Sequence, residues 1–89
     1  MVIDGFFTFE EVALELGIPR DLLEHFVEME WLLPAQSETQ RLDVEDRARV
    51  RLICDLRDRM GINEEGISVV LHLIDQLHGL MSELEALRK

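Results

Sequence analysis

Three histidines and one cysteine are the side chains of this sequence best suited to bind a metal ion or to act as nucleophiles. His72 and His78 are six residues apart, so on one helix they lie on different faces and are poorly placed to share a metal ion. Cys54 lies among leucine and isoleucine residues, a setting typical of a small buried side chain. His25, His72 and His78 form no cluster of ligands. We therefore expect no metal site and no cofactor.

Carboxylates are the commonest reactive groups, and the adjacent pairs Glu10–Glu11 and Glu64–Glu65 are candidates for acid–base chemistry. Neighbouring residues on a helix point apart, so such pairs fit the first turn of a helix better, where the positive end of the helix dipole favours acids. The sequence contains no serine or cysteine nucleophile arrangement and no glycine-rich phosphate loop. We expect no enzyme activity.

The composition points to one small acidic domain. The chain has 89 residues, with 19 Asp and Glu against nine Lys and Arg, and a formal net charge of −10. A hydrophobic content of 47% is too high for a disordered acidic tail, and a single cysteine rules out an intrachain disulfide. The apolar runs are too short to span a membrane, and Met1–Asp4 lacks the basic start of a signal peptide. We expect a cytoplasmic protein with no membrane partner.

The negative charge is concentrated in the first third of the chain. Residues 1–34 carry a net charge of −7, residues 35–60 are neutral, and residues 61–89 carry −3. Nucleic-acid affinity depends on neutralising phosphates, so this distribution disfavours DNA and favours a positively charged protein partner.

Two short helices are predicted within residues 1–34. Thr8 and Glu11 have the spacing of a capping box at the start of the first helix, and Gly17 suits its end. Pro19 suits the first turn of the second helix. Two short helices joined by a glycine-containing turn form a helix-turn-helix.

The rest of the chain is predicted to form a wing-like loop over 35–41, a third helix over 42–60 and a long helix over 63–88, all in a single domain over 1–89. Asp43 and Asn63 are suitable N-caps for the two helices, and Met60–Gly61–Ile62 separates them. The third helix has an expected apolar face, which comprises Val44, Ala48, Val50, Leu52, Ile53 and Leu56. The fold class is therefore expected to be all-α.

The long helix carries apolar residues at alternating steps of three and four, the spacing of a coiled-coil seam. The expected dimer interface comprises Ile67, Val70, Ile74, Leu77, Met81 and Leu84, widened by Leu71, Leu73, Leu80 and Leu87. We expect a two-fold homodimer, the alternative being a helix that folds back on its own domain. The seam still repeats at the last residues, so a longer natural chain is compatible with the sequence.

The segment Thr8–Ile18, Trp31–Pro34, and the two segments Leu42–Asp46 and Leu56–Ile62 resemble, in that order, the MerR-type winged helix-turn-helix. The closer resemblance, carried by Met60–Leu77, is to the CbpM-type chaperone modulators. That resemblance implies a protein that binds the J-domain of a CbpA-like co-chaperone and inhibits its stimulation of a DnaK-type chaperone. It also implies that the contacted J-domain helix is basic.

A DNA-reading second helix should expose basic and amide side chains. Here the second helix is acidic, and Glu24 and His25 stand where DNA-binding relatives usually carry basic residues. Glu30 stands where those relatives usually carry glycine. The expected partner-binding residues are Glu10, Glu11, Asp21, Glu24, Glu28 and Glu30. Trp31 is considered both as an aromatic anchor and as a core residue, and a rival patch surrounds Arg57, Asp58 and Glu64.

Two alternatives to the chaperone modulator remain. The first is a MerR-like DNA-binding transcription regulator that uses the loop at 35–41 and the third-helix arginines, namely Arg47, Arg49, Arg51, Arg57 and Arg59. The second is a structural dimerisation module for another basic protein.

Overall fold

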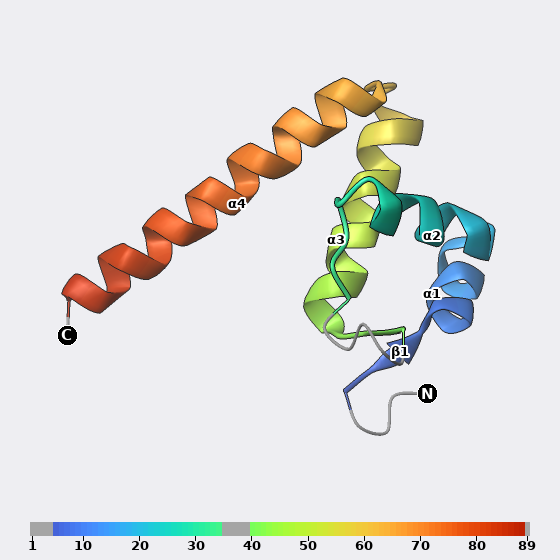
Figure 1. Cartoon of the computed structure of the whole chain (residues 1–89), viewed down its shortest axis with the longest axis horizontal. Coiled ribbons are helices and arrows are strands. Elements are labelled where there is room, and N and C mark those ends of the chain that lie inside the picture. The colour runs from blue at the N-terminus through green and yellow to red at the C-terminus, as the bar shows by residue number, and fades with distance from the viewer. Residues whose placement is uncertain (1–4, 35–39, 89) are drawn as a thin grey trace. The chain divides into compact units, whose positions relative to one another are not determined.

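The structure is a computed structural model, and it describes residues 5–34 and 40–88 (Figure 1). Within them the elements are β1 (Phe7–Thr8), α1 (Phe9–Leu16), α2 (Arg20–Glu28), β2 (Arg41–Leu42), α3 (Val44–Cys54), the π-helix η1 (Asp55–Arg59) and α4 (Glu64–Leu87). The expected mostly helical fold with a long C-terminal helix is confirmed. The chain divides into two compact units, residues 1–55 and 56–89, which are described separately.

Both ends of α1 are formed by the residues that the sequence indicates. The hydroxyl of Thr8 accepts a hydrogen bond of 3.1 Å from the Glu11 amide, and the Glu11 carboxylate accepts one of 3.0 Å from the Thr8 amide. Gly17 follows the helix with φ of 67°, a left-handed conformation that glycine adopts without strain. The amides of Gly17 and Ile18 bond the carbonyls of Leu14 and Ala13, which is the Schellman arrangement.

A two-stranded antiparallel sheet, which was not predicted, joins the start of the helix-turn-helix to the start of α3. Phe7 pairs with Leu42 and Thr8 with Arg41. Thr8 therefore both ends β1 and caps α1. Residues 35–39 of the predicted wing-like loop lie outside the described residues, and its last residue, Arg41, belongs to β2.

The helix α3 begins at a second capping box, in which Asp43 and Asp46 bond each other's backbone amides at 2.7 and 3.0 Å. The apolar face expected for this helix is wrong in part, because Val44 is 55% exposed and Ala48 is also exposed. Val50 and Ile53 are the buried residues of α3. At about 100° per residue, Val44 and Ala48 lie roughly opposite Val50, so both face solvent.

The core of the first unit combines both strands with α1, α2, α3 and the segment after α2. Its buried apolar residues are Phe7, Phe9, Val12, Ala13, Leu23, Phe26, Trp31, Leu32, Leu42, Val50 and Ile53. α1 and α2 pack against each other (Figure 1). The helix α2 contributes Leu23 and Phe26, three residues apart on one face, which leaves its opposite face free for the carboxylates.

η1 ends at the predicted break, and four residues separate it from α4. Gly61 has φ of 64°, and the Asn63 side chain caps α4 through a hydrogen bond of 2.8 Å from the Gly66 amide. Ile67 and Leu71 are the buried residues of α4, and every residue from 75 to 88 is exposed. No helix within the described residues is both long and apolar enough to cross a lipid bilayer.

Candidate functional site

The acidic face of α2 consists of Asp21, Glu24 and Glu28, which recur at steps of three and four. It exists because Pro19 starts the helix in an extended conformation, with φ of −67°, and because Leu23 and Phe26 turn the other face into the core. Asp21 and Glu28 are exposed, and the Glu24 side chain is 46% exposed. Three carboxylates in two turns of helix make this surface attractive to cations.

Glu30 follows the C-cap residue of α2, Met29, in a left-handed conformation with φ of 62°. Its amide bonds the Val27 carbonyl at 3.0 Å, and the Trp31 amide bonds the Phe26 carbonyl at 3.0 Å, so the Schellman arrangement that ends α1 is repeated. A glycine would adopt this conformation without strain. The exposed Glu30 carboxylate extends the acidic surface past the end of α2.

Glu10 and Glu11 have structural partners within the first unit. Arg20 Nη1 lies 2.7 Å from Glu10 Oε2, so a cation of the chain itself already neutralises this carboxylate. Hydrogen bonds from the backbone amide and then from the hydroxyl of Thr8 lower the pKa of the Glu11 carboxyl below its ordinary value. Of the six predicted partner-binding residues, Asp21, Glu28 and Glu30 have no ion-pair partner among the described residues.

Trp31 is a core residue, which is one of the two roles that the sequence left open for it. It is 4% exposed, packs on Phe26 with ring centroids 5.7 Å apart, and meets His25 edge-on at 6.1 Å. The left-handed Glu30 reverses the chain and directs Trp31 back beneath α2. The indole therefore supports the acidic helix from below.

The third-helix arginines are largely engaged within the protein. Arg47 lies over the Phe7 ring, 4.6 Å from its centroid, and 3.6 Å from a Glu15 oxygen. Arg49 Nε donates a hydrogen bond to the Trp31 carbonyl. Both guanidinium groups tie α3 to the helix-turn-helix, so they are poorly available for phosphates. Arg51 is exposed and has no polar partner among the described residues.

The rival patch contains an internal ion pair, since Arg57 Nη1 lies 3.3 Å from Asp58 Oδ1. Among the residues that the structure describes, no three histidine, cysteine or acidic side chains gather in a group that could hold a metal ion. Cys54, which the sequence suggested is buried, is half-buried.

The predicted dimer residues differ in exposure along α4. Ile67 is 1% exposed, so its side chain is already buried within the single chain. Val70 and Ile74 are half-buried, and Leu77, Met81 and Leu84 are more than half exposed. Further exposed leucines that the sequence assigned to the edge of this stripe are Leu73, Leu80 and Leu87.

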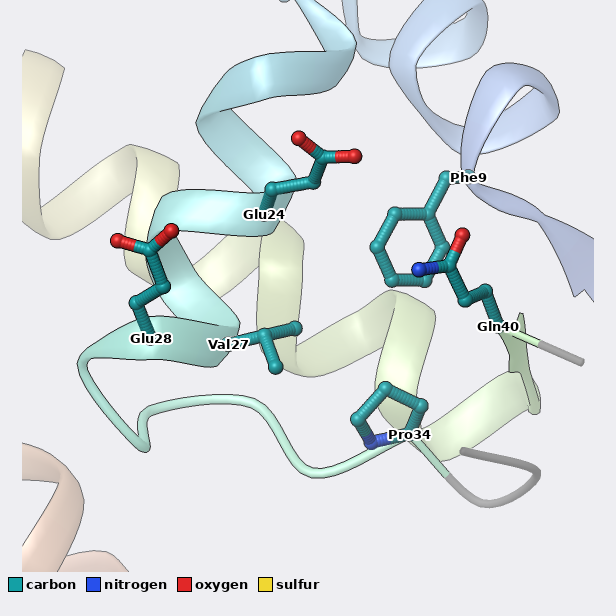
Figure 2. A pocket seen from close by; sticks show the side chains of 6 residues that line it. All are labelled: Phe9, Glu24, Val27, Glu28, Pro34 and Gln40. Atoms are coloured by element: carbon teal, nitrogen blue, oxygen red, sulfur yellow. The ribbon is translucent and has the colours of Figure 1, made fainter. Parts of the chain in front are cut away.

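A cavity of about 290 Å³ lies beside α2 and was not predicted from the sequence. It is lined by Phe9, Glu24, Val27, Glu28, Pro34 and Gln40 (Figure 2). No sequence spacing indicates it, because the start of α1, the middle of α2 and the residue before β2 come together only in the folded chain. Of its lining residues, only Glu24 and Glu28 were predicted from the sequence to bind a partner.

Comparison with known families matches residues 7–89 to the family described as "MerR HTH family regulatory protein". A comparison with curated proteins finds no match. The match covers the sheet, the helix-turn-helix, α3 and α4, up to the last residue of the chain. This chain therefore belongs to the MerR helix-turn-helix family.

Proposed function

We propose that this chain is a chaperone modulator of the CbpM type. It binds the J-domain of a CbpA-like co-chaperone and thereby inhibits stimulation of a DnaK-type chaperone. The observation that carries the proposal is the acidic face of α2. This helix is the one that a DNA-binding helix-turn-helix protein places in the major groove, and here it exposes Asp21, Glu24 and Glu28.

Electrostatics favour a basic protein over DNA for this surface. Carboxylates repel phosphates, whereas they speed encounter with a basic helix and select against acidic partners. The J-domain helix that meets the DnaK-type chaperone is basic in the family that the chain resembles. A modulator bound to that helix prevents its contact with the chaperone, so inhibition follows by competition.

The arginine contacts support the same proposal. A DNA-binding protein needs several free cations next to its recognition helix. Arg20, Arg47 and Arg49 are instead held by Glu10, Glu15 and the Trp31 carbonyl. They stabilise the unit that presents the acids, and so contribute to binding indirectly.

The proposal includes a homodimer formed through α4. Exposed leucines recur at steps of four and three, and they are Leu73, Leu77, Leu80, Leu84 and Leu87. Monomeric proteins rarely expose such a continuous apolar stripe, and burying one leucine side chain contributes about 1.5–3 kcal/mol. A second copy offers an equal stripe, so the pairing is self-complementary.

The proposal is tested by calorimetric titration of the chain with the J-domain of a CbpA-like protein at low and moderate salt. We expect binding that weakens as salt rises, and inhibition of the co-chaperone-stimulated ATPase of the DnaK-type chaperone. The charge reversals Glu24→Lys and Glu28→Lys should weaken binding.

Glu83→Lys and Glu85→Lys are the matched controls, because they change the net charge equally at the exposed end of α4. Absence of binding at both salt concentrations contradicts the proposal. Equal affinity in all four variants would place the contact elsewhere, with the patch at Arg57, Asp58 and Glu64 as the next candidate. If the chain instead binds a different basic protein in a pull-down and does not bind the J-domain, the result favours the alternative of a structural dimerisation module.

A DNA-binding regulator is the second candidate, and the family match favours it. Arg51 is the cation of α3 that this function would use, because it is exposed and unpaired among the described residues. A mobility-shift assay on bent or AT-rich DNA distinguishes the two functions. Sequence-selective retention that Arg51→Gln abolishes would favour the regulator.

A further inference from the structure

The cavity beside α2 combines an apolar wall with carboxylates. Phe9, Val27 and Pro34 provide the wall, and Gln40 lies next to Phe9 (Figure 2). The Glu24 carboxylate is directed toward the Phe9 side, while the Glu28 side chain points outward from the rim one turn later (Figure 2). All of these residues belong to the first compact unit. The cavity therefore has an apolar interior and a negative edge.

The cavity is large enough to receive one long side chain. Pockets for small ligands span roughly 300–1,000 Å³, and this one, at about 290 Å³, lies at the lower limit of that range. Lysine and arginine side chains have an apolar stem and a cationic end, and such residues bury the stem along apolar surface while the charge stays near water or a counter-ion. The apolar stem of such a side chain matches the apolar wall of the cavity, and its cationic end matches the carboxylates.

The chain itself supplies a precedent for a guanidinium at this wall. The Arg20 Cζ atom lies 5.6 Å from the centroid of the Phe9 ring, and Arg20 Nη2 donates a hydrogen bond of 2.7 Å to Gln40 Oε1. Arg20 Nη1 contacts Glu10 at 2.7 Å, whereas Arg20 Nε is 3.8 Å from Glu24 Oε1. Glu10 is thus the closer partner of Arg20, and the Glu24 carboxylate makes no hydrogen bond with Arg20 at this distance.

We propose that this cavity receives one lysine or arginine side chain from a basic helix of the protein partner. The apolar stem lies against Phe9, Val27 and Pro34, and the cationic end meets the Glu24 carboxylate. Glu28, which has no ion-pair partner among the described residues, lies at the rim and attracts the cation from there through its charge. This inference rests on the proposed function, which identifies the basic helix as that of the J-domain. It adds that the acidic face binds a lysine or arginine side chain of that helix.

This assignment separates two kinds of carboxylate on one helix. Asp21 lies on the same face of α2 but does not line the cavity, so it acts on an approaching partner only through solvent. Glu24 and Glu28 act on a cation held against an apolar wall, where contacts exclude water and single residues dominate binding. The three carboxylates should therefore differ in their effects although they have equal charge.

The experiment compares the isosteric variants Glu24→Gln, Glu28→Gln and Asp21→Asn in titrations with the J-domain. Each variant removes one negative charge, and circular dichroism verifies that it folds. Each cavity variant should weaken binding by roughly three- to tenfold, and Asp21→Asn by less than about twofold. Lysines and arginines of the basic J-domain helix are then replaced by alanine one at a time. One of these replacements should weaken binding to the parent chain but have little effect on binding to Glu24→Gln, because the two side chains contact each other.

A second measurement does not depend on the J-domain. N-acetyl-lysine methylamide and N-acetyl-arginine methylamide are titrated into the chain, with the neutral norleucine compound as the matched control, and NMR shifts are recorded. Shifts confined to the cavity residues, seen for the cationic probes and lost in Glu24→Gln, support the inference.

The two measurements separate the inference from the proposed function. If the J-domain binds, but the three variants behave alike and the probes cause no cavity shifts, the cavity assignment is wrong while the proposed function stands. If the probes bind in the cavity and the J-domain does not bind, the cavity assignment stands and the proposed function is wrong. If neither binds, both are overturned.

Discussion

Gly17 and Glu30 occupy the same position in two equivalent helix ends. Each follows its helix with a left-handed backbone, with φ of 67° and 62°, and each is followed by a residue whose amide bonds a carbonyl five residues earlier. Glycine adopts this conformation freely, whereas a residue with a Cβ atom is strained by about 1–2 kcal/mol. The end of α1 is thus relaxed and the end of α2 is strained.

We therefore expect Glu30→Gly to raise the free energy of unfolding by about 1 kcal/mol. Gly17→Ala should lower it by a similar amount, although an added Cβ at Gly17 meets no atom within 4 Å, because the backbone alone causes the strain. Urea unfolding followed by circular dichroism measures both effects. If Glu30→Gly is less stable than the parent chain, the prediction is wrong, and interactions of the Glu30 side chain outweigh the backbone strain.

Local rules explain why the helix ends were predictable. Thr8, Asp43 and Asn63 cap their helices through hydrogen bonds to amides three residues later, which is a spacing that sequence displays directly. Gly17 and Gly61 end or separate helices because both need positive φ. Each of these interactions lies within a few residues, so no knowledge of the tertiary fold is required.

Contacts between distant segments were not predictable in this way. The strands β1 and β2 have two residues each, too few to show an alternating pattern, and they pair residues 33 or more positions apart. The cavity likewise joins Phe9, the middle of α2 and Gln40. Trp31 was uncertain because an aromatic residue after a helix fits both a core and an interface, and only its burial decides between them.

Glu11 predicts a pH dependence of stability. Its pKa is lowered in the folded protein by the Thr8 amide and hydroxyl, so the ionised carboxylate stabilises the fold above the unfolded-state pKa. That contribution is lost as pH falls through the folded-state pKa. In Glu11→Gln the amide oxygen still accepts a hydrogen bond from the Thr8 amide but does not titrate.

The parent chain should therefore be more stable than Glu11→Gln at neutral pH, and the difference should shrink between about pH 5 and pH 3. Urea unfolding at a series of pH values measures it. Glu83→Gln, at the exposed end of α4, controls for the loss of one charge. It should leave the decrease in stability at acidic pH unchanged. A difference that stays constant with pH would contradict the role of the ionised carboxylate.

Two glycines of α4 should respond in opposite directions to the same substitution. Replacing glycine by alanine inside a helix gains about 0.5–1 kcal/mol of helix propensity. At Gly79 an added Cβ meets no atom within 4 Å, so Gly79→Ala should stabilise by that amount. At Gly66 it would lie 2.6 Å from the Ile62 Cγ2 methyl and 3.2 Å from the capping Asn63 oxygen.

Gly66→Ala should therefore destabilise the protein, because displacing Ile62 and weakening the Asn63 cap outweigh the gain in propensity. Thermal unfolding of each variant and of the parent chain at equal concentration measures whether the melting temperature rises or falls. Stabilisation by both substitutions would mean that Ile62 moves aside without cost.

The exposed leucine stripe of α4 predicts self-association that a single charge disrupts. Leu77 is 55% exposed and lies in the middle of the stripe, with Leu73 and Leu80 one turn to either side. In a dimer, Leu77→Glu places two carboxylates in an apolar seam, and each unpaired buried charge costs several kcal/mol. Sedimentation velocity should show a dimer for the parent chain and a monomer for Leu77→Glu.

Leu14→Glu is the matched control, since Leu14 is 85% exposed on α1 and lies outside the stripe. It adds the same charge and removes the same side chain, and it should leave the sedimentation coefficient unchanged. The J-domain titration repeated with Leu77→Glu then asks whether pairing matters for the acidic face, because α2 lies in the first compact unit and the stripe in the second. A parent chain that sediments as a monomer at all concentrations would contradict the proposed dimer and require a different protein to cover the leucines.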